Sequence, residues 1–321
     1  MSRIFLTRLG EQYGAPIAEG LRWLGGATGL APGVRVSIKP NLTYPRFREG
    51  VMTSPDAVEA LVRELKRTTD RITICESDSG GYNRFSMDEV FRVTSLAAMA
   101  AREGVAVVNM SKAPSRPVRM RAGRRTIDVP LPTLLLDETD VFITMPVPKL
   151  HLNTAMSFAI KNQWGVIQEP ALRLKLHPWF SDVIRGVNRA LPRTLVVADG
   201  RWGLDRTGPL RGDPVRLDWI MVADGVWHAD RCAAELIGLD WRRVAYLRRI
   251  LPAEGAATLA DVTFNAPWQQ FRSRPFALRR AWTDLPGYAC FHSRALAWIG
   301  YESPLAAPLH WLLYRFREPF Y

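Results

Sequence analysis

Short apolar runs alternate with amphipathic helical stretches over most of the first 240 residues of this 321-residue chain. Such runs are typical of strands buried on both faces of a sheet, and a helix between two of them is typical of a βαβ unit. Because parallel strands need crossover connections of this kind, the alternation predicts an α/β protein. We expect a Rossmann-like, doubly wound, mostly parallel sheet.

The expected elements can be placed on the sequence. The predicted strands cover residues 3–9, 33–41, 71–76, 105–110, 140–151, 193–200 and 218–225. The predicted helices cover residues 15–26, 53–68, 86–104, 153–165, 180–191 and 228–238. The basic segment 121–132, RAGRRTIDVPLP, predicts a hairpin.

The alternation fades near residue 240, which divides the chain into an α/β domain, 1–240, and an extension, 241–321. The extension is basic, irregular and rich in Trp and Pro, and we expect it to pack on the core or to dock a protein partner. Its last residues, LAAPLHWLLYRFREPFY, leave a peripheral membrane helix open as an alternative. No long apolar stretch and no signal peptide is recognised, so a cytoplasmic protein is expected.

Composition argues against several function classes. The net charge of +12 would suit nucleic-acid binding, but the basic clusters at 111–125, 241–249 and 272–280 are dispersed and contain no nucleic-acid motif. The three cysteines are widely separated, so neither a disulfide framework nor an iron–sulfur cluster is expected. The phosphate-binding pattern GxGxxG and the related NTP and hydrolase motifs are missing, so there is no NAD signature.

Lysine is rare in this chain. Of the 43 basic residues only six are lysines, Lys39, Lys66, Lys112, Lys149, Lys161 and Lys175. Arginine is a fixed planar fork, whereas lysine is a compact charge whose pKa burial can lower. Lysines kept in an arginine-rich chain therefore indicate positions where arginine would fail.

Lys39 and Asn41 follow the apolar run VRVSI, at the expected carboxyl end of a strand. Ligands of open parallel sheets bind at that edge. The next helix is expected to begin at Thr53 or Ser54, where free backbone N–H groups favour an anion. The four residues together predict a phosphate or carboxylate site. The alternative is that Asn41 stabilises a loop while Lys39 points to solvent.

A second strand end contains Lys149 and His151, and Lys161 with Asn162 follows ten residues later. Lys161 interrupts an apolar stretch, which predicts a partly buried amine that acts as a base or nucleophile, or that pairs with a carboxylate. We expect Lys149 and Asn162 to contact the same anion as Lys39.

Acidic residues at two further strand ends complete the predicted site. Glu76 and Asp78, in ICESDSGG, are candidates for proton transfer together with His151. A divalent metal held by His151, His177 and Asp199 is a second interpretation, although no HxH or HExxH spacing supports it. Asp199 also suits an ordinary Asp-Gly turn.

The order of these motifs resembles a known family. IKPNL, TSPDAVEALVREL, ICESDSGG, PVPKLH, AIKNQWGVI, LHPWFSDVIRGVN and ADGVWHADRCAAELIG together are similar to the prokaryotic domain of unknown function 362, over roughly residues 30–240. Many members are described as iron–sulfur proteins, but the cysteines for that are missing here. A more distant similarity to the N-terminal domain of nickel-dependent lactate racemases implies roles for His151, His177 and Lys161 near a metal-containing cofactor.

Two functions are therefore expected as alternatives. The first is an enzyme that acts on a small carboxylated or phosphorylated substrate, with Lys39, Asn41 and Lys149 as anion ligands. The second is a non-catalytic binding, assembly or maturation subunit that docks on a larger complex through its basic surface and residues 241–321.

Overall fold

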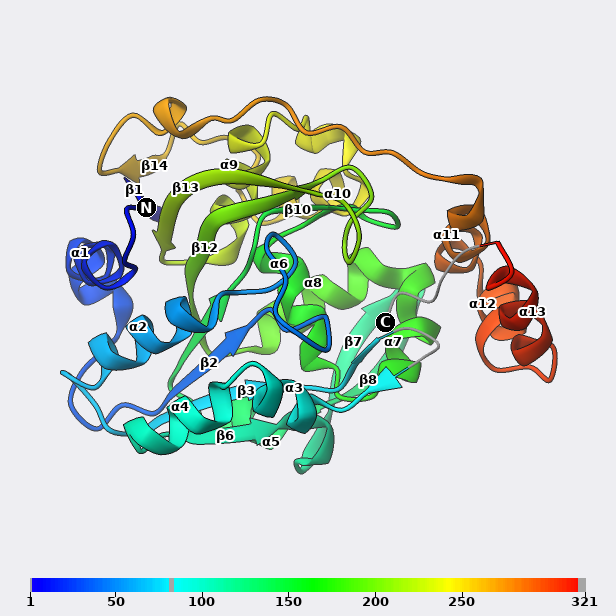
Figure 1. The fold of residues 1–321 in the computed structure, drawn as a ribbon, viewed down its shortest axis with the longest axis horizontal. Coiled ribbons are helices and arrows are strands. Elements are labelled where there is room, and N and C mark those ends of the chain that lie inside the picture. The colour runs from blue at the N-terminus through cyan, green and yellow to red at the C-terminus, as the bar shows by residue number, and fades with distance from the viewer. Residues whose placement is uncertain (1, 81–83, 317–321) are drawn as a thin grey trace.

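The computed structural model describes residues 2–80 and 84–316, and a mixed sheet lies at its centre (Figure 1). The strands run in the order β14-β1-β13-β12-β9-β2-β3-β6, and β10 extends the sheet beside β12 with β11 paired to it. Their bounds are β1 Ser2–Arg8, β2 Val36–Pro40, β3 Ile72–Glu76, β6 Ala106–Asn109, β9 Val141–Met145, β10 Lys149–His151, β11 Ala155–Ser157, β12 Arg193–Asp205, β13 Asp213–Ala223 and β14 Val262–Phe264.

The half of the sheet that holds the candidate site is parallel. β12, β9, β2, β3 and β6 are all parallel neighbours, so their carboxyl ends meet at one edge. β13 runs antiparallel to both β1 and β12. The fold is therefore Rossmann-like α/β with a mostly parallel sheet, as predicted.

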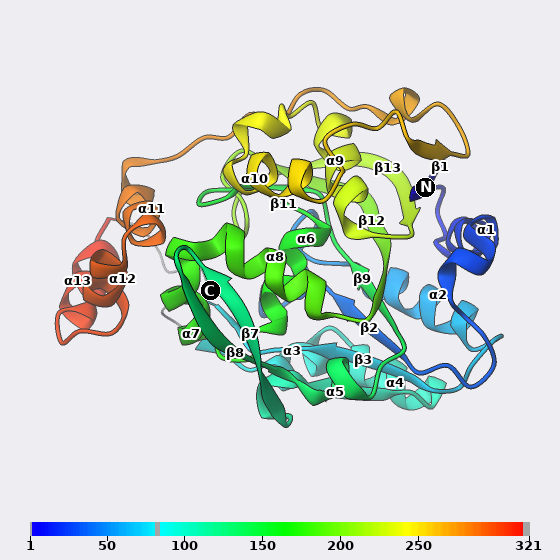
Figure 2. The same ribbon diagram turned by 180° about the vertical axis from the view of Figure 1, so that it is seen from behind.

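Helices cover both faces of the sheet, as Figures 1 and 2 show from opposite sides. The helices are α1 Gly14–Leu24, α2 Pro55–Leu65, α3 Met87–Val93, α4 Leu96–Glu103, α5 Thr133–Asp137, α6 Ala159–Asn162, α7 Pro170–Leu176, α8 Phe180–Ala190, α9 Val226–Leu236, α10 Ala245–Ala253, α11 Leu285–His292, α12 Arg294–Tyr301 and α13 Ala306–Leu313. One apolar core lies between the sheet and α1–α4, and a second lies between the sheet and α5, α6 and α8–α10.

Local signals explain several elements. Ser54 caps α2 by accepting a hydrogen bond from the Asp56 amide, and Pro55 occupies the first turn, as predicted. The predicted hairpin forms as β7 Ser115–Ala122 and β8 Arg125–Pro132. Two short strands, β4 Ser79–Gly80 and β5 Arg84–Phe85, pair after β3.

The prediction was wrong between residues 140 and 165. The expected single strand is two, β9 and β10, and the expected helix 153–165 begins only at Ala159, after β11. The Asp230 carboxylate of α9 accepts the Ile160 amide at 2.9 Å, and Ala155, the first residue of β11, adopts a positive φ of 66°. These tertiary contacts favour a turn and a short helix over the helical pattern of the sequence.

The residues after 240 do not form one irregular segment. α10 packs against α8 and α9, and β14 pairs in parallel with β1, so part of the predicted extension belongs to the α/β unit. Residues 285–313 contain the three helices α11–α13, which lie together at one side of the molecule (Figure 2). Among the helices described, none is long and apolar enough to span a bilayer.

Candidate functional site

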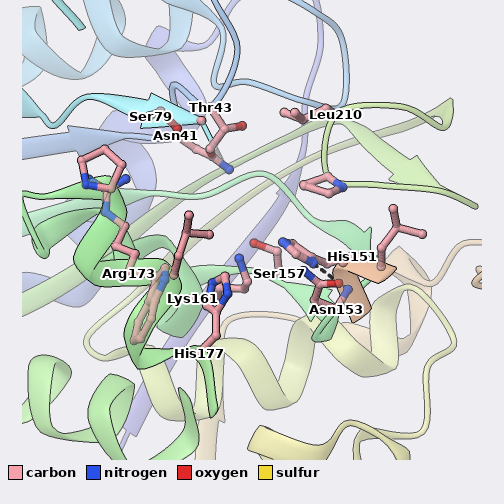
Figure 3. A pocket seen from close by; sticks show the side chains of 18 of the residues that line it. Asn41, Thr43, Ser79, His151, Asn153, Ser157, Lys161, Arg173, His177 and Leu210 are labelled. Carbon is pink, nitrogen blue, oxygen red and sulfur yellow. Dashed lines mark hydrogen bonds between the residues drawn. The ribbon is translucent and has the colours of Figure 1, made fainter. Parts of the chain in front are cut away.

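A cavity of about 260 Å³ opens at the carboxyl ends of the parallel strands. Its polar lining residues include Lys39, Asn41, Thr43, Glu76, Ser79, Lys149, His151, Asn153, Ser157, Lys161, Asn162, Arg173 and His177. Figure 3 shows many of these side chains around a common space, with Asn41 and Thr43 opposite Lys161 and His177. The structure thus brings together most of the site residues expected from the sequence.

Lys39 and Glu76 form a buried ion pair at one wall of the cavity. The Lys39 Nζ atom lies 2.7 Å from Glu76 Oε2, and the two side chains are 1% and 5% exposed. The other carboxylate oxygen of Glu76 accepts the Ser77 amide at 3.0 Å. Adjacent parallel strands β2 and β3 place the two residues side by side. Lys39 therefore does not point to solvent.

A tight backbone contact supports this pair. Gly165 lies against it, and a Cβ atom at Gly165 would come within 2.8 Å of Glu76 Oε1 and 2.9 Å of Lys39 Nζ. Real Cβ atoms do not make such close contacts with nonbonded atoms, so a larger residue would displace the ion pair. Gly165 is thus a cavity residue that sequence reasoning missed.

Lys149 extends from β10 and is 1% exposed. Its Nζ donates to the Val51 carbonyl at 2.7 Å and to Thr43 Oγ1 at 3.4 Å. Burial and the neighbouring cations Lys161 and Lys39 lower its pKa well below the ordinary lysine value. The amine has polar neighbours but makes no hydrogen bond to a carboxylate in the part of the chain that the structure describes, so an anion in the cavity would stabilise its charge.

The amine of Lys161 projects into the cavity from α6, whose backbone is fixed on both sides. The Ile160 amide donates to Asp230 Oδ2 at 2.9 Å, and the Ile160 carbonyl accepts Asn188 Nδ2 at 3.1 Å. Within residues 2–80 and 84–316 the Lys161 amine makes no hydrogen bond or ion pair, and its Nζ lies 6.0 Å from the centre of the Phe180 ring.

The environment of Lys161 destabilises its charged form. Burial, followed by the charges of Arg173 and Lys39, lowers its pKa to about 7. A large fraction of the molecules therefore has a neutral amine at neutral pH. A neutral amine is a base and a nucleophile, whereas an ammonium group is neither.

His151 has a defined tautomer. Its Nδ1 accepts the Asn153 amide at 3.1 Å and the Thr154 amide at 3.5 Å, which leaves Nε2 to carry the proton (Figure 3). Burial and the nearby Lys161 and Lys149 charges hold its pKa well below the ordinary histidine value. In this state the ring is a neutral hydrogen-bond donor rather than a base.

His177 lies among aromatic side chains. Its ring stacks on Trp164 with centroids 5.9 Å apart and contacts Phe291 of α11 at 4.7 Å. Burial, with Lys161 and Arg173 adding to it, lowers its pKa to about 3, so the ring is neutral in the physiological range.

Arg173 of α7 is a cavity residue that the sequence analysis missed. Its Nε donates to the Ile167 carbonyl at 2.6 Å, and its Nη2 donates to Ser77 Oγ at 2.5 Å. Burial lowers its pKa to about 10, so it keeps its charge at neutral pH. The side chain is 8% exposed, which is unusual for arginine and could not be recognised among so many arginines.

The outer part of the cavity is also built by residues that were not predicted. Gly287, Tyr301, His310 and Tyr314 line it from the helices α11–α13 and the turn after them. Nothing near these residues in the sequence indicates a site, because they reach the cavity only through the packing of α11 and α12 on η4 (His177–Trp179) and α7.

The predicted site residues Asn41 and Asn162 differ in their hydrogen bonds. Asn162 Nδ2 donates to Thr144 Oγ1 at 2.8 Å and to the Lys39 carbonyl at 3.3 Å, which ties α6 to the strand ends. Asn41 is 2% exposed, and its Oδ1 has no hydrogen-bond partner among residues 2–80 and 84–316. A buried polar atom without a partner is costly, so a ligand that donates a hydrogen bond to Asn41 would stabilise the site.

Three predicted site residues have other roles. The Thr53 hydroxyl donates to the Met145 carbonyl and accepts the Asn41 amide, and Ser54 caps α2 while its amide donates to Asp199. Asp78 accepts the Met87 amide at the start of α3. None of the three lines the cavity. The start of α2 is therefore occupied by the protein's own carboxylate, and it does not contribute to an anion site beside Lys39.

The predicted metal ligands do not come together. His151 and His177 line the cavity, but Asp199 lies outside it, where Tyr13 and the amides of Ser54 and Arg201 donate to its carboxylate. Within the described part of the chain, no group of three or more His, Cys, Asp or Glu side chains is placed to hold a metal ion. The surplus of cationic side chains also disfavours a metal cation, so this donor set does not fit one.

Comparison with known proteins identifies the family. Residues 36–235, more than half of the chain, match the family described as Domain of unknown function (DUF362). The chain belongs to the DUF362 family. The motif resemblance seen over roughly residues 30–240 is thereby confirmed.

One relative and one solved structure are also similar to part of this chain. A thylakoid-associated protein of Synechocystis sp. is 24% identical over 230 residues, which cover 66% of this chain. The match spans 65% of the length of that relative. A solved structure of a Thermotoga maritima protein from a structural genomics consortium has 17% sequence identity and a TM-score of 0.46, covering 72% of this DUF362 chain and 60% of that one.

Proposed function

We propose that this DUF362 protein is a cytoplasmic enzyme that acts on a small carboxylated or phosphorylated substrate, with the Lys161 amine as base or nucleophile. One observation supports the proposal most directly. Lys39, Lys149, Lys161 and Arg173 line one cavity, whose carboxylates among the described residues are Glu76 and Asp284. Positive charge is therefore in excess where a ligand would bind.

The roles follow from the geometry. Lys149 and Arg173 supply charge to the anionic group, and the His151 Nε2–H donates a hydrogen bond to it. Lys39 contributes charge while it is held by Glu76. Lys161, neutral in part of the population, accepts a proton from the substrate or attacks an electrophilic carbon. Positioned proton transfer typically contributes about 10²–10⁴-fold to a rate.

Anion binding and protonation are coupled in this arrangement. A bound anion opposes the two causes that lower the pKa of Lys161, burial and neighbouring cations, and so raises that pKa. The complex then binds more protons than the free protein above pH about 7. By linkage, affinity is highest where Lys161 is already charged and falls as the pH rises.

We therefore expect sulfate, whose charge is constant near neutrality, to bind more weakly above pH about 7, by up to about tenfold per pH unit. Isothermal titration calorimetry between about pH 6 and pH 9 measures this. Lys161→Met should reduce the slope, with Lys149 remaining as a second amine whose pKa a bound anion raises, and the exposed Lys112→Met is the matched control that should keep the full slope. Equal affinities across this range for the unaltered protein would contradict the proposed role of Lys161.

Catalysis is tested separately from binding. Carboxylates and phosphate esters that raise the melting temperature are incubated with the protein in D₂O, and NMR follows exchange of the C–H proton beside the anionic group and formation of new species. We expect at least one ligand to change, with a rate reduced about 100-fold or more in Lys161→Met.

The alternative function predicts a different outcome of the same experiment. A binding, assembly or maturation subunit would bind one of these anions and return it unchanged, with no proton exchange. That result, obtained with ligands that bind the cavity, would favour the non-catalytic interpretation.

A further inference from the structure

The cavity is larger than a small anion needs. Its volume of about 260 Å³ approaches that of pockets that hold whole small molecules, about 300–1,000 Å³. Its inner end is deep, since Lys39 and Lys149 are each 1% exposed, and the other cations there are Lys161 and Arg173. A carboxylate or phosphate group bound at this end leaves the outer part of the cavity for the rest of the ligand.

The cavity also has apolar and aromatic walls. The loop between β12 and β13 contributes Pro209 and Leu210, and α7 contributes Leu174. Tyr301 and Tyr314, both half-buried, line the outer part from the last residue of α12 and from the residue after α13. These walls offer contact area to a ligand rather than charge.

Aromatic rings are prominent in this lining. Trp164 and His177 stack on each other with centroids 5.9 Å apart. At the outer end, the Tyr301 ring lies 6.0 Å from the His310 ring, which lies 5.6 Å from the Tyr314 ring. These separations are typical of interacting aromatic pairs. We call Tyr301, His310 and Tyr314 the aromatic cluster.

Hydrogen bonds hold the aromatic cluster in place. Nε2 of His310 lies 3.0 Å from the Gly300 carbonyl oxygen, and Nδ1 lies 3.3 Å from the Tyr314 hydroxyl. Because a carbonyl only accepts, Nε2 carries a proton. Both ring nitrogens are thus engaged by the protein, and a ligand contacts His310 through the carbon surface of its ring. Rings held in this way lose little freedom when a flat apolar group packs against them.

The outer end does not suit a second anionic group. Asp284, which lines the cavity just before α11, brings a negative charge there, and its Oδ2 accepts the Ala281 amide at 2.8 Å. The cations of the cavity lie at the strand ends and on α6 and α7 instead. A matching ligand is therefore anionic at its inner end and uncharged at its outer end.

We infer that the ligand of this site is an aromatic anion, a carboxylate or phosphate attached to a flat ring. Its anionic group contacts Lys149, Lys161 and Arg173, and its ring packs on the aromatic cluster. The inference rests on the proposed function, which places the anion. Tyr301 and Tyr314 are then specificity-determining residues, because contacts between rings favour an aromatic body over an aliphatic one of the same size.

Three sulfonates test the inference, since each carries one negative charge that does not change with pH near neutrality. Benzenesulfonate has a flat ring, cyclohexanesulfonate has a puckered ring of similar size, and methanesulfonate has no ring. By isothermal titration calorimetry we expect benzenesulfonate to bind at least about tenfold more tightly than methanesulfonate. It should bind about threefold or more tightly than cyclohexanesulfonate.

Substitutions in the aromatic cluster locate the ring of the ligand. Tyr301→Leu/Tyr314→Leu should bind benzenesulfonate and cyclohexanesulfonate about equally, whereas Tyr301→Phe/Tyr314→Phe should keep the preference because both rings remain. Tyr288→Leu is the matched control, since Tyr288 is a half-buried tyrosine of α11 outside the cavity lining, and it should also keep the preference. Sulfate, which needs only the inner end, should bind all three variants like the unaltered protein.

Equal binding of benzenesulfonate and cyclohexanesulfonate by the unaltered protein would overturn the inference. This comparison needs no variant, so it decides the question even if Tyr301→Leu/Tyr314→Leu does not fold. A preference that survives in that variant, with sulfate binding retained, would overturn the role of the aromatic cluster. Sulfate binding without a preference among the sulfonates would leave the proposed function standing, whereas a protein that binds neither sulfate nor any sulfonate would contradict both.

Discussion

Lys161→Met is expected to raise the free energy of unfolding of the ligand-free protein by about 2–4 kcal/mol at about pH 6. The difference between the ordinary lysine pKa of 10.5 and about 7 corresponds to about 5 kcal/mol. The expected gain is smaller because the amine faces a cavity that water can enter. Met has a similar length and carries no charge that needs solvation.

The stabilisation by Lys161→Met is expected to be largest at low pH and to decrease as the pH rises. Below pH about 7 Lys161 is charged in both the folded and the unfolded chain, and the folded state bears the full cost of the buried charge. Between about 7 and 10.5 the folded chain releases the proton first, so the cost declines as the pH rises. Urea denaturation at about pH 6 and about pH 9.5 should therefore show a gain that falls by about half or more.

The exposed Lys112→Met is the control, and it should change the free energy of unfolding by less than about 1 kcal/mol at either pH. A destabilised Lys161→Met variant at pH 6 would show that the amine is stabilised by its surroundings. The proposed role as a base would then lose its physical basis.

Lys39→Met is expected to have the opposite effect and to lower the free energy of unfolding by about 3–5 kcal/mol. The substitution leaves the buried Glu76 carboxylate without the partner that lies 2.7 Å away. Glu76→Gln should also destabilise, because it leaves the Lys39 ammonium group without its carboxylate.

A double-mutant cycle separates the interaction free energy of Lys39 and Glu76 from the effect of each substitution alone. Lys39→Met/Glu76→Gln should recover much of the loss of Lys39→Met, with a coupling of about 1–3 kcal/mol by urea denaturation. Strictly additive effects would mean that the two side chains do not depend on each other in the folded state.

The part of the site that could be predicted is the part that the direction and order of the strands determine. β2 and β3 are hydrogen-bonded parallel neighbours, and β9 leads directly into β10, so Lys39, Glu76, Lys149 and His151 had to meet at one edge. An apolar run that ends in a polar residue is visible in a single sequence. The scarcity of lysine added an independent signal for Lys161.

The rest depends on contacts between distant segments. Thr53, Asp78 and Asp199 stand at the expected places, but backbone groups occupy their side chains. Arg173 is one arginine among many, and only its burial distinguishes it. His310 reaches the cavity because the C-terminal helices pack on α7, and no local pattern encodes that.

Gly165 has a consequence for how this family can vary. Its backbone does not have a positive φ, so the requirement for glycine comes from the space taken by Lys39 and Glu76 and from nothing else. A relative with alanine at this position must move the ends of the Lys39 and Glu76 side chains or replace one of them. Substitutions at positions 39, 76 and 165 are thus expected to be correlated during evolution.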